Sequence, residues 1–186
     1  MPNTTLDAFI AEVRSAWGPL TTALADECRR AMEALAAAPP SEPWVAGLLR
    51  DAPASRELYR DPAHGFVLMA HTEAQGLYRP PHDHGRAWVI YAALQGEIEI
   101  GTYARIEAED GSARLVRRDS RPMRAGEARV YLPGDIHDTR CLTPSAVLLR
   151  FTERDLKVED RIERRLTRYV ERGGVWTTEA APCPAW

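Results

Sequence analysis

Residues 80–85 read Pro80-Pro81-His82-Asp83-His84-Gly85, which places two histidines one residue apart. Alternate side chains of a β-strand point to the same face. We therefore expect His82 and His84 to aim at one point while Asp83 points away. Imidazole is the commonest protein metal ligand near neutral pH, and the chain has only five histidines. The pair predicts a metal site, with a surface turn carrying incidental histidines as the alternative.

Short apolar or alternating segments surround this pair. They lie at residues 66–70, 88–91, 96–101, 104–106, 113–116, 129–132 and 145–151, between turn signals. Asp110-Gly111 is expected to form a hairpin turn. Many short strands between turns predict a mainly β fold, an antiparallel barrel or jelly roll. Residues 160–172 fit either a helix or a late strand before Gly173-Gly174, and both interpretations stay open.

The first 52 residues are predicted to be helical instead. Apolar residues at spacings of three and four indicate a helix that ends near Gly18-Pro19, namely Leu6, Phe9, Ile10, Val13 and Trp17. A second helix is expected from about Thr21 to Ala37, and Ser41 is expected to cap a third through Leu49. We expect residues 1–55 to be a helical segment packed on a barrel formed by residues 56–186.

Composition limits the class of protein. The chain has 186 residues, 45% of them hydrophobic and 27% charged, which is ordinary for a globular domain. A net charge of −3 gives no reason to expect nucleic acid, and no apolar run reaches the length of a membrane span. The start of the chain lacks signal-peptide features. Cys28, Cys141 and Cys183 form no disulfide framework, so we expect a cytoplasmic protein. A homodimer stays open.

A bound metal needs at least three protein ligands, and His137 has the best context for the third. It follows the strand and tight turn Leu132-Pro133-Gly134-Asp135-Ile136. In an antiparallel barrel, such a hairpin can bring it opposite His82 and His84. His71 is expected to be a core or surface residue, although it lies on the strand before the pair and can face the same cavity. His64, between Pro62 and Gly65, is predicted to be a loop residue.

These motifs resemble those of the cupin superfamily. The first cupin motif, G(X)5HXH(X)3-4E(X)6G, is matched by Gly76, His82, His84 and Gly96, with Val89 at the glutamate position. The second, G(X)5PXG(X)2H(X)3N, is matched by Gly126, Gly134 and His137, with Leu132 and Cys141 at its proline and asparagine positions. The resemblance implies a double-stranded β-helix, which is a jelly-roll barrel, and His82, His84 and His137 as metal ligands.

Val89 cannot ligate a metal, so the expected site is a neutral three-histidine face. This set is similar to that of the thiol dioxygenase branch of cupins, which holds ferrous iron and uses O2. The resemblance implies an iron(II) dioxygenase that oxidises a small anionic substrate, a thiol giving its sulfinate. Two features of that branch are absent. Val89 replaces the crosslinking cysteine, and the Ser-X-His-X-Tyr stretch falls near 147–151 without its polar side chains.

An anionic substrate needs a cationic partner, and arginine suits carboxylates. The candidates are Arg56 and Arg60, upstream of the first barrel strand, and Arg79 and Arg86, which flank the histidine pair. Each can equally be a solvated charge. Three aromatic residues, Tyr78, Tyr91 and Tyr131, could supply a hydroxyl group to the site or pack in the core. Trp88 is expected to pack in the barrel or line the pocket.

Three alternatives to thiol oxidation remain at this stage. The same three-histidine face serves oxygenases that cleave a carbon–carbon bond of a diketone or hydroxylated aromatic. It can also hold zinc, manganese or nickel for hydrolysis or isomerisation. The altered second motif and the missing polar triad favour a metal-binding cupin without oxygenase activity, whereas the intact histidines oppose it.

Overall fold

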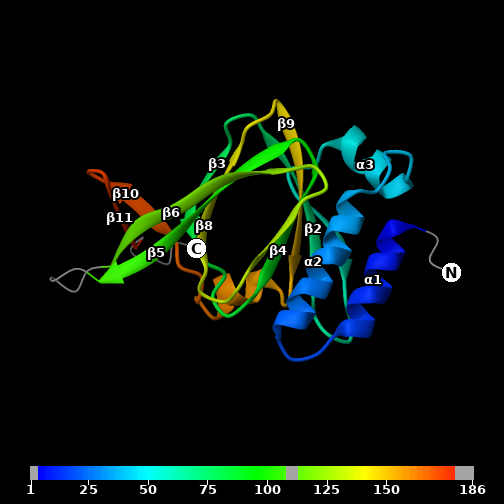
Figure 1. The fold of residues 1–186 in the computed structure, drawn as a ribbon, viewed down its shortest axis with the longest axis horizontal. Helices are drawn as coiled ribbons and strands as arrows, with labels where there is room; N and C mark the ends of the chain where they lie inside the picture. Colours follow the sequence, from blue (N-terminus) through cyan, green and yellow to red (C-terminus); the bar gives the residue numbers. More distant parts are fainter. Residues whose placement is uncertain (1–3, 108–112, 179–186) are drawn as a thin grey trace.

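Two antiparallel sheets face each other, and helices cover one of them (Figure 1). The structure is a computed structural model that describes residues 4–107 and 113–178. The expected turn at Asp110-Gly111 lies outside these residues. In sheet order, the first sheet consists of β1 (Arg56–Arg60), β2 (Val67–Ala74), β9 (Ser145–Thr152), β4 (Val89–Gln95) and β7 (Ala128–Tyr131). The second consists of β3 (Tyr78–His82), β8 (Ile136–Cys141), β5 (Glu97–Glu107) and β6 (Ala113–Arg124).

The strand order identifies the barrel as a jelly roll. Strand β9 lies between β2 and β4 in the first sheet, and β8 lies between β3 and β5 in the second. The chain therefore passes repeatedly from one sheet to the other, and its late strands pair with its early ones. This is the double Greek-key arrangement of jelly rolls, to which cupins belong. The predicted mainly β jelly-roll fold with N-terminal helices is confirmed.

Three helices precede the barrel, close to where the hydrophobic spacing predicts them. They are α1 (Thr5–Ala16), α2 (Thr22–Ala36) and α3 (Pro43–Asp51). The hydroxyls of Thr4 and Thr21 cap α1 and α2. The prediction that Ser41 caps the third helix is wrong, because the N-cap residue is Glu42. The Glu42 carboxylate accepts hydrogen bonds from Thr5 instead, so it links α3 to the start of α1.

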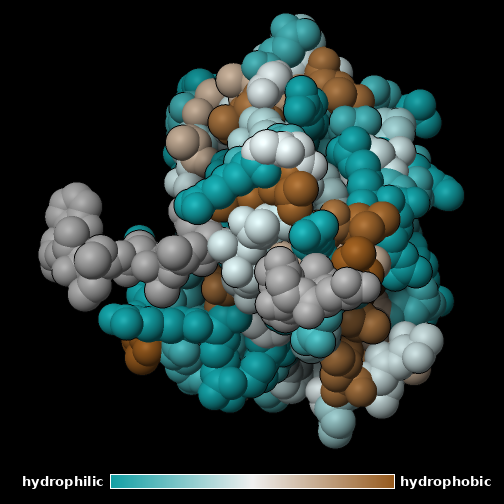
Figure 2. Space-filling model, turned by 90° about the vertical axis from the view of Figure 1, so that its left-hand side faces the viewer, coloured by the Kyte–Doolittle hydropathy of each residue, from teal (hydrophilic) through white to brown (hydrophobic). Residues whose placement is uncertain are grey.

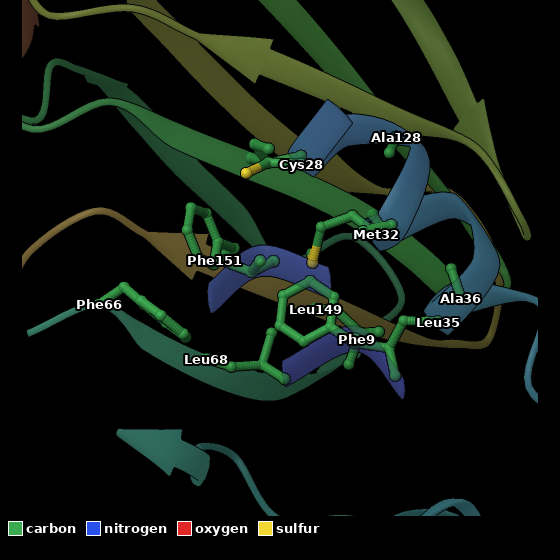
Figure 3. Packing of buried hydrophobic residues seen from close by; sticks show 14 of the residues in the cluster. Phe9, Cys28, Met32, Leu35, Ala36, Phe66, Leu68, Ala128, Leu149 and Phe151 are labelled. Carbon is green, nitrogen blue, oxygen red and sulfur yellow. The ribbon is translucent and has the colours of Figure 1, made fainter. Parts of the chain in front are cut away.

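The helix-covered sheet is buried on both faces. In β4, Ile90 and Ala92 pack toward the helices, whereas Val89, Tyr91 and Ala93 belong to a separate cluster inside the barrel. Figure 3 shows Met32 and Leu35 of α2 and Phe9 of α1 beside Leu68, Leu149 and Phe151 of the sheet. Burial on both faces explains why this strand is an unbroken apolar run rather than an alternating one.

Asp61 joins α1 to the barrel. It is 1% exposed, pairs with Arg14 of α1, and accepts hydrogen bonds from the Tyr59 hydroxyl and the backbone N–H groups of Ala63 and His64. Burial by itself raises the pKa of this carboxyl. The Arg14 ion pair and the hydrogen bonds outweigh that effect and hold the pKa at about 2. Asp61 therefore stays charged and stabilises the fold at neutral pH.

Replacing Asp61 by alanine is expected to lower the free energy of unfolding by about 2 kcal/mol, because the Tyr59 hydroxyl and the backbone N–H groups of Ala63 and His64 lose a charged acceptor, whereas the half-exposed Arg14 can turn to water. Since the folded-state pKa lies below the ordinary value, this stabilisation is present above about pH 4 and is lost as the pH falls toward the folded-state pKa. Urea denaturation at neutral and acid pH measures both effects. Asp119→Ala, which breaks the exposed pair with Arg121, is the control and should change stability by under about 0.5 kcal/mol.

The last described segment returns across the barrel. A π-helical turn, Val158–Ile162, is followed by the hairpin of β10 (Tyr169–Arg172) and β11 (Val175–Thr178). The open question for residues 160–172 is thereby answered as a short helical turn followed by a strand. In the described residues, no helix is both long and apolar enough to cross a membrane.

The end of the molecule that carries β10 and β11 has a mixed surface. Figure 2 shows hydrophilic residues interspersed with several separate hydrophobic patches among the described residues of that face. One exposed hydrophobic residue of the preceding turn is Ile162, at 75% exposure. The three histidines that are predicted to bind a metal lie inside the barrel instead.

Candidate metal centre

His82 and His137 lie directly opposite each other on neighbouring strands. His82 ends β3, and its Cα partner on β8 is His137. Directly opposed residues of an antiparallel pair project to the same face, and the two ring centroids are 4.9 Å apart. The hairpin that carries His137 therefore brings it to the histidine pair, as its sequence context predicts.

His84 reaches the same point from outside the strand. β3 ends at His82, so the expectation that strand alternation aims both histidines is wrong for His84. A turn places it instead. The Asp83 carboxylate points away and accepts hydrogen bonds from the backbone N–H groups of Gly85 and Thr167. Gly85 has a φ of +62°, and a Cβ there would lie 2.8 Å from the Glu159 carboxylate, so the tight turn requires glycine.

The three imidazoles form one compact group. One ring nitrogen from each of His82, His84 and His137 lies within 4.8 Å of the others, and the group contains no Asp, Glu or Cys among the described residues. The His82 Nδ1 lies 2.8 Å from the carbonyl oxygen of Pro80. Because a carbonyl only accepts, Nδ1 carries the hydrogen and leaves Nε2 free to bind a metal. The arrangement can hold a metal ion.

His137 provides the clearest test of that fit. It is fully buried, and neither ring nitrogen has a hydrogen-bond partner in the described part of the chain. A buried polar group without a partner is costly. Burial, and then the neighbouring His82 and His84, lower the pKa of His137 well below its ordinary value. The imidazole is therefore neutral at neutral pH, which is the form that ligates a metal.

A cavity of about 530 Å³ opens beside His82 and His84. Of the residues predicted to contact substrate, Tyr78, Arg79 and Tyr91 line it. Arg79 pairs with the buried Glu73 at 2.8 Å, and the Tyr78 hydroxyl donates to Asp138. The Tyr91 hydroxyl lies 3.3 Å from His84 Nε2. Tyr91 is thus the predicted residue whose hydroxyl lies next to the histidines.

Four other candidates lie elsewhere. Arg56 pairs with Asp51 of α3, and Arg60 pairs with Glu57 and Asp155 on the outside of the barrel. Arg86 binds Glu159 and Glu163 of the C-terminal segment. Trp88 faces the helices and packs on Trp17 and Phe151, because its neighbour Val89 takes the inward direction. Neither these arginines nor Trp88 line the cavity.

Among the cavity residues that were not predicted as site residues, His71 and Arg150 are polar groups on the inner strands. His71 lines the cavity rather than packing in the core, and burial, followed by the charges of Arg150 and Arg79, lowers its pKa to about 3. Arg150 also lines the cavity, from the middle of β9. A signal for Arg150 was present in the sequence. It is a charged residue inside the otherwise apolar run 146–151, at the same strand parity as Leu148.

Val89, at the glutamate position of the first cupin motif, is fully buried on the inner face of β4. It packs in the same cluster as Tyr131, whose ring centroid is 4.2 Å from that of His137. An aliphatic side chain thus occupies the position at which the cupin motif has a carboxylate. The candidate metal centre is therefore electrically neutral before a metal binds.

No protein-family model matches the chain, and no curated protein matches its sequence. Among solved structures, the cupin domain of Schizosaccharomyces pombe Cnp3 is similar at 13% identity, over 60% of this chain and 66% of that chain, with a TM-score of 0.43. KdgF from Halomonas sp. is similar at 22% identity, over 54% of this chain and 80% of that chain, with a TM-score of 0.42. Oxalate oxidase in complex with glycolate is similar at 24% identity, over 54% of this chain, with a TM-score of 0.41. The match spans 51% of the oxalate oxidase chain, which is about half its length. The fold assignment rests on the strand order of this chain.

Proposed function

We propose that this protein is a mononuclear non-haem iron(II) dioxygenase that oxidises a small anionic thiol to its sulfinate. The observation that carries the proposal is the three-histidine group, which contains no carboxylate among the described residues and in which both nitrogens of the buried His137 lack a partner there. In this proposal His82, His84 and His137 are the metal ligands. Three neutral ligands leave the full 2+ charge uncompensated, which favours an anionic substrate.

When bound, ferrous iron would supply the redox chemistry with O2, and the chain would supply binding and orientation. Three ligands on one face leave coordination positions open, as in other non-haem iron sites. The cavity beside His82 and His84 provides room for a small molecule. Burial raises the pKa of Tyr91, so its hydroxyl keeps its proton beside His84 and can donate a hydrogen bond to a bound group.

The protein loaded anaerobically with iron(II) is expected to consume O2 when a small thiol is added, and mass spectrometry should show a product heavier by two oxygen atoms. His84→Ala should lose both the bound iron and the oxygen uptake. Arg50→Ala, an exposed substitution on α3, is the matched control and should keep both. An iron-loaded protein that consumes no O2 with any small thiol would contradict the thiol proposal. If the iron-loaded protein instead consumes O2 with a small diketone and cleaves it, the carbon–carbon alternative would be supported.

A further inference from the structure

Arg150 lines the cavity from β9. It lies on β9 between β2 and β4, with Met69 and Tyr91 as its Cα partners. Because Tyr91 faces the barrel interior, its cross-strand partner Arg150 faces the same side. The cavity is lined by Arg150, Tyr91 and His84 together, and the Tyr91 hydroxyl is 3.3 Å from His84 Nε2. The guanidinium therefore shares one cavity with the candidate metal ligands.

Arg150 has no carboxylate partner among the described residues. The other cavity arginines with a defined partner are Arg79, paired with Glu73, and Arg168, paired with Asp160. The Nε of Arg150 is buried and has no hydrogen-bond partner in the described part of the chain. A partly buried cation with an unused donor is costly unless an anion completes it. The Arg150 guanidinium can therefore bind an anion from outside the protein.

The charge of the cavity points the same way. Five cationic residues and two carboxylates line it, although the whole chain carries a net charge of −3. The cations are Arg79, Arg150, Lys157, Arg161 and Arg168, and the carboxylates are Glu73 and Asp160. Cationic side chains thus outnumber carboxylates in the lining, although the whole chain is acidic. Such a lining concentrates small anions.

We propose that Arg150 is the substrate-binding residue that holds the carboxylate of a short thiol acid, while the thiol end reaches the three-histidine site. The inference rests on the proposed function of that site, at which the thiol binds, and adds the carboxylate as the second group of the substrate that the protein recognises. Arginine can bind a carboxylate through two parallel hydrogen bonds, and the unused Nε supplies one of the donors. Because Arg150 and Tyr91 are directly opposed on neighbouring strands and the Tyr91 hydroxyl lies beside His84, we expect a short chain between the carboxylate and the thiol of the substrate.

The test compares acid and amide ligands on zinc-loaded protein, in which no redox chemistry occurs. Mercaptoacetate and 3-mercaptopropionate are titrated by calorimetry, each alongside its amide, into the native protein and into Arg150→Gln and Arg150→Lys. The native protein should bind the better acid about 10- to 100-fold more tightly than its amide. Arg150→Gln should remove this preference, and Arg150→Lys should retain part of it. The control is Arg140→Gln. Arg140 is exposed and stacks on the ring of Tyr78 but does not itself line the cavity, so this variant should keep the native preference.

The outcomes separate this inference from the proposed function. An acid preference that survives in Arg150→Gln, or a native protein that binds acid and amide equally, would overturn the role of Arg150. The second comparison needs no variant, so it holds even if Arg150→Gln does not fold. Oxygen uptake with thiol amides as good as with thiol acids would leave the dioxygenase standing and overturn this inference. Arg150-dependent acid binding without oxygen uptake under iron would support the inference and contradict the thiol dioxygenase.

Discussion

Replacing His137 by glutamine is expected to weaken metal binding by on the order of 100-fold or more. Loss of a supporting residue around a metal ligand already costs tenfold to 100-fold, and His137 is proposed as a ligand itself. Its two ring nitrogens have no other partner in the described residues, so the glutamine removes metal affinity without breaking a hydrogen bond within the protein. Competition with a chromophoric chelator, using zinc or cobalt, measures the affinity.

Stability supplies the second measurement for His137. A metal present at 100 times its dissociation constant should raise the unfolding free energy of the native protein by about 2.7 kcal/mol, and that of the variant by nearly nothing. His64→Gln is the matched control, because His64 lies outside the cavity and stacks on Trp17. It should bind metal like the native protein. Native affinity in the His137 variant would show that the metal binds elsewhere.

Replacing Val89 by glutamate is expected to make stability strongly dependent on metal. Val89 is fully buried on the inner face of β4, so the metal-free variant must bury a carboxylate at a cost of several kcal/mol. A metal held by the three histidines would give that carboxylate a partner and restore most of the loss. Urea denaturation with and without zinc measures the difference. The added negative charge should also weaken binding of an anionic thiol to the zinc-loaded protein.

Val89→Gln separates charge from size in this experiment. Glutamine has nearly the same volume and carries no charge, so metal should restore much less stability to it than to the glutamate variant. If zinc stabilises both variants equally, position 89 does not face the metal. The importance given to valine at that position would then be overturned, whereas the three-histidine group itself would stand.

Several parts of this structure could be predicted because they depend on local spacing. The periodic apolar residues of the first 52 positions predict three helices, and the strands follow the apolar runs between turns. The strand and tight turn at residues 132–136 predict that His137 enters the next strand, and β8 indeed carries it opposite His82. Within Trp88 to Ala93, however, burial on both faces removes the alternation. The direction of Trp88 could therefore not be deduced from its neighbours.

The placement of His84 and of two candidate arginines shows the limit of local prediction. His84 lies beyond the end of β3 and is aimed by a turn whose Asp83 binds the backbone of Thr167, a residue 84 positions away. No local pattern contains that contact. Likewise, Arg56 and Arg60 have suitable chemistry near the first strand, yet nearby carboxylates on the outer surface bind both.

The sequence by itself determined the mainly β fold, the helical start and the set of three histidines, because these follow from periodicity, turn residues and a scarce ligand type. Only the tertiary structure decided that Arg150 lines the cavity beside the histidines. Arg150 does so because β9 is inserted between β2 and β4, which turns its inner side chains into the cavity. A charge on a strand shows its function only when the strands on either side, far away in the chain, define what it faces.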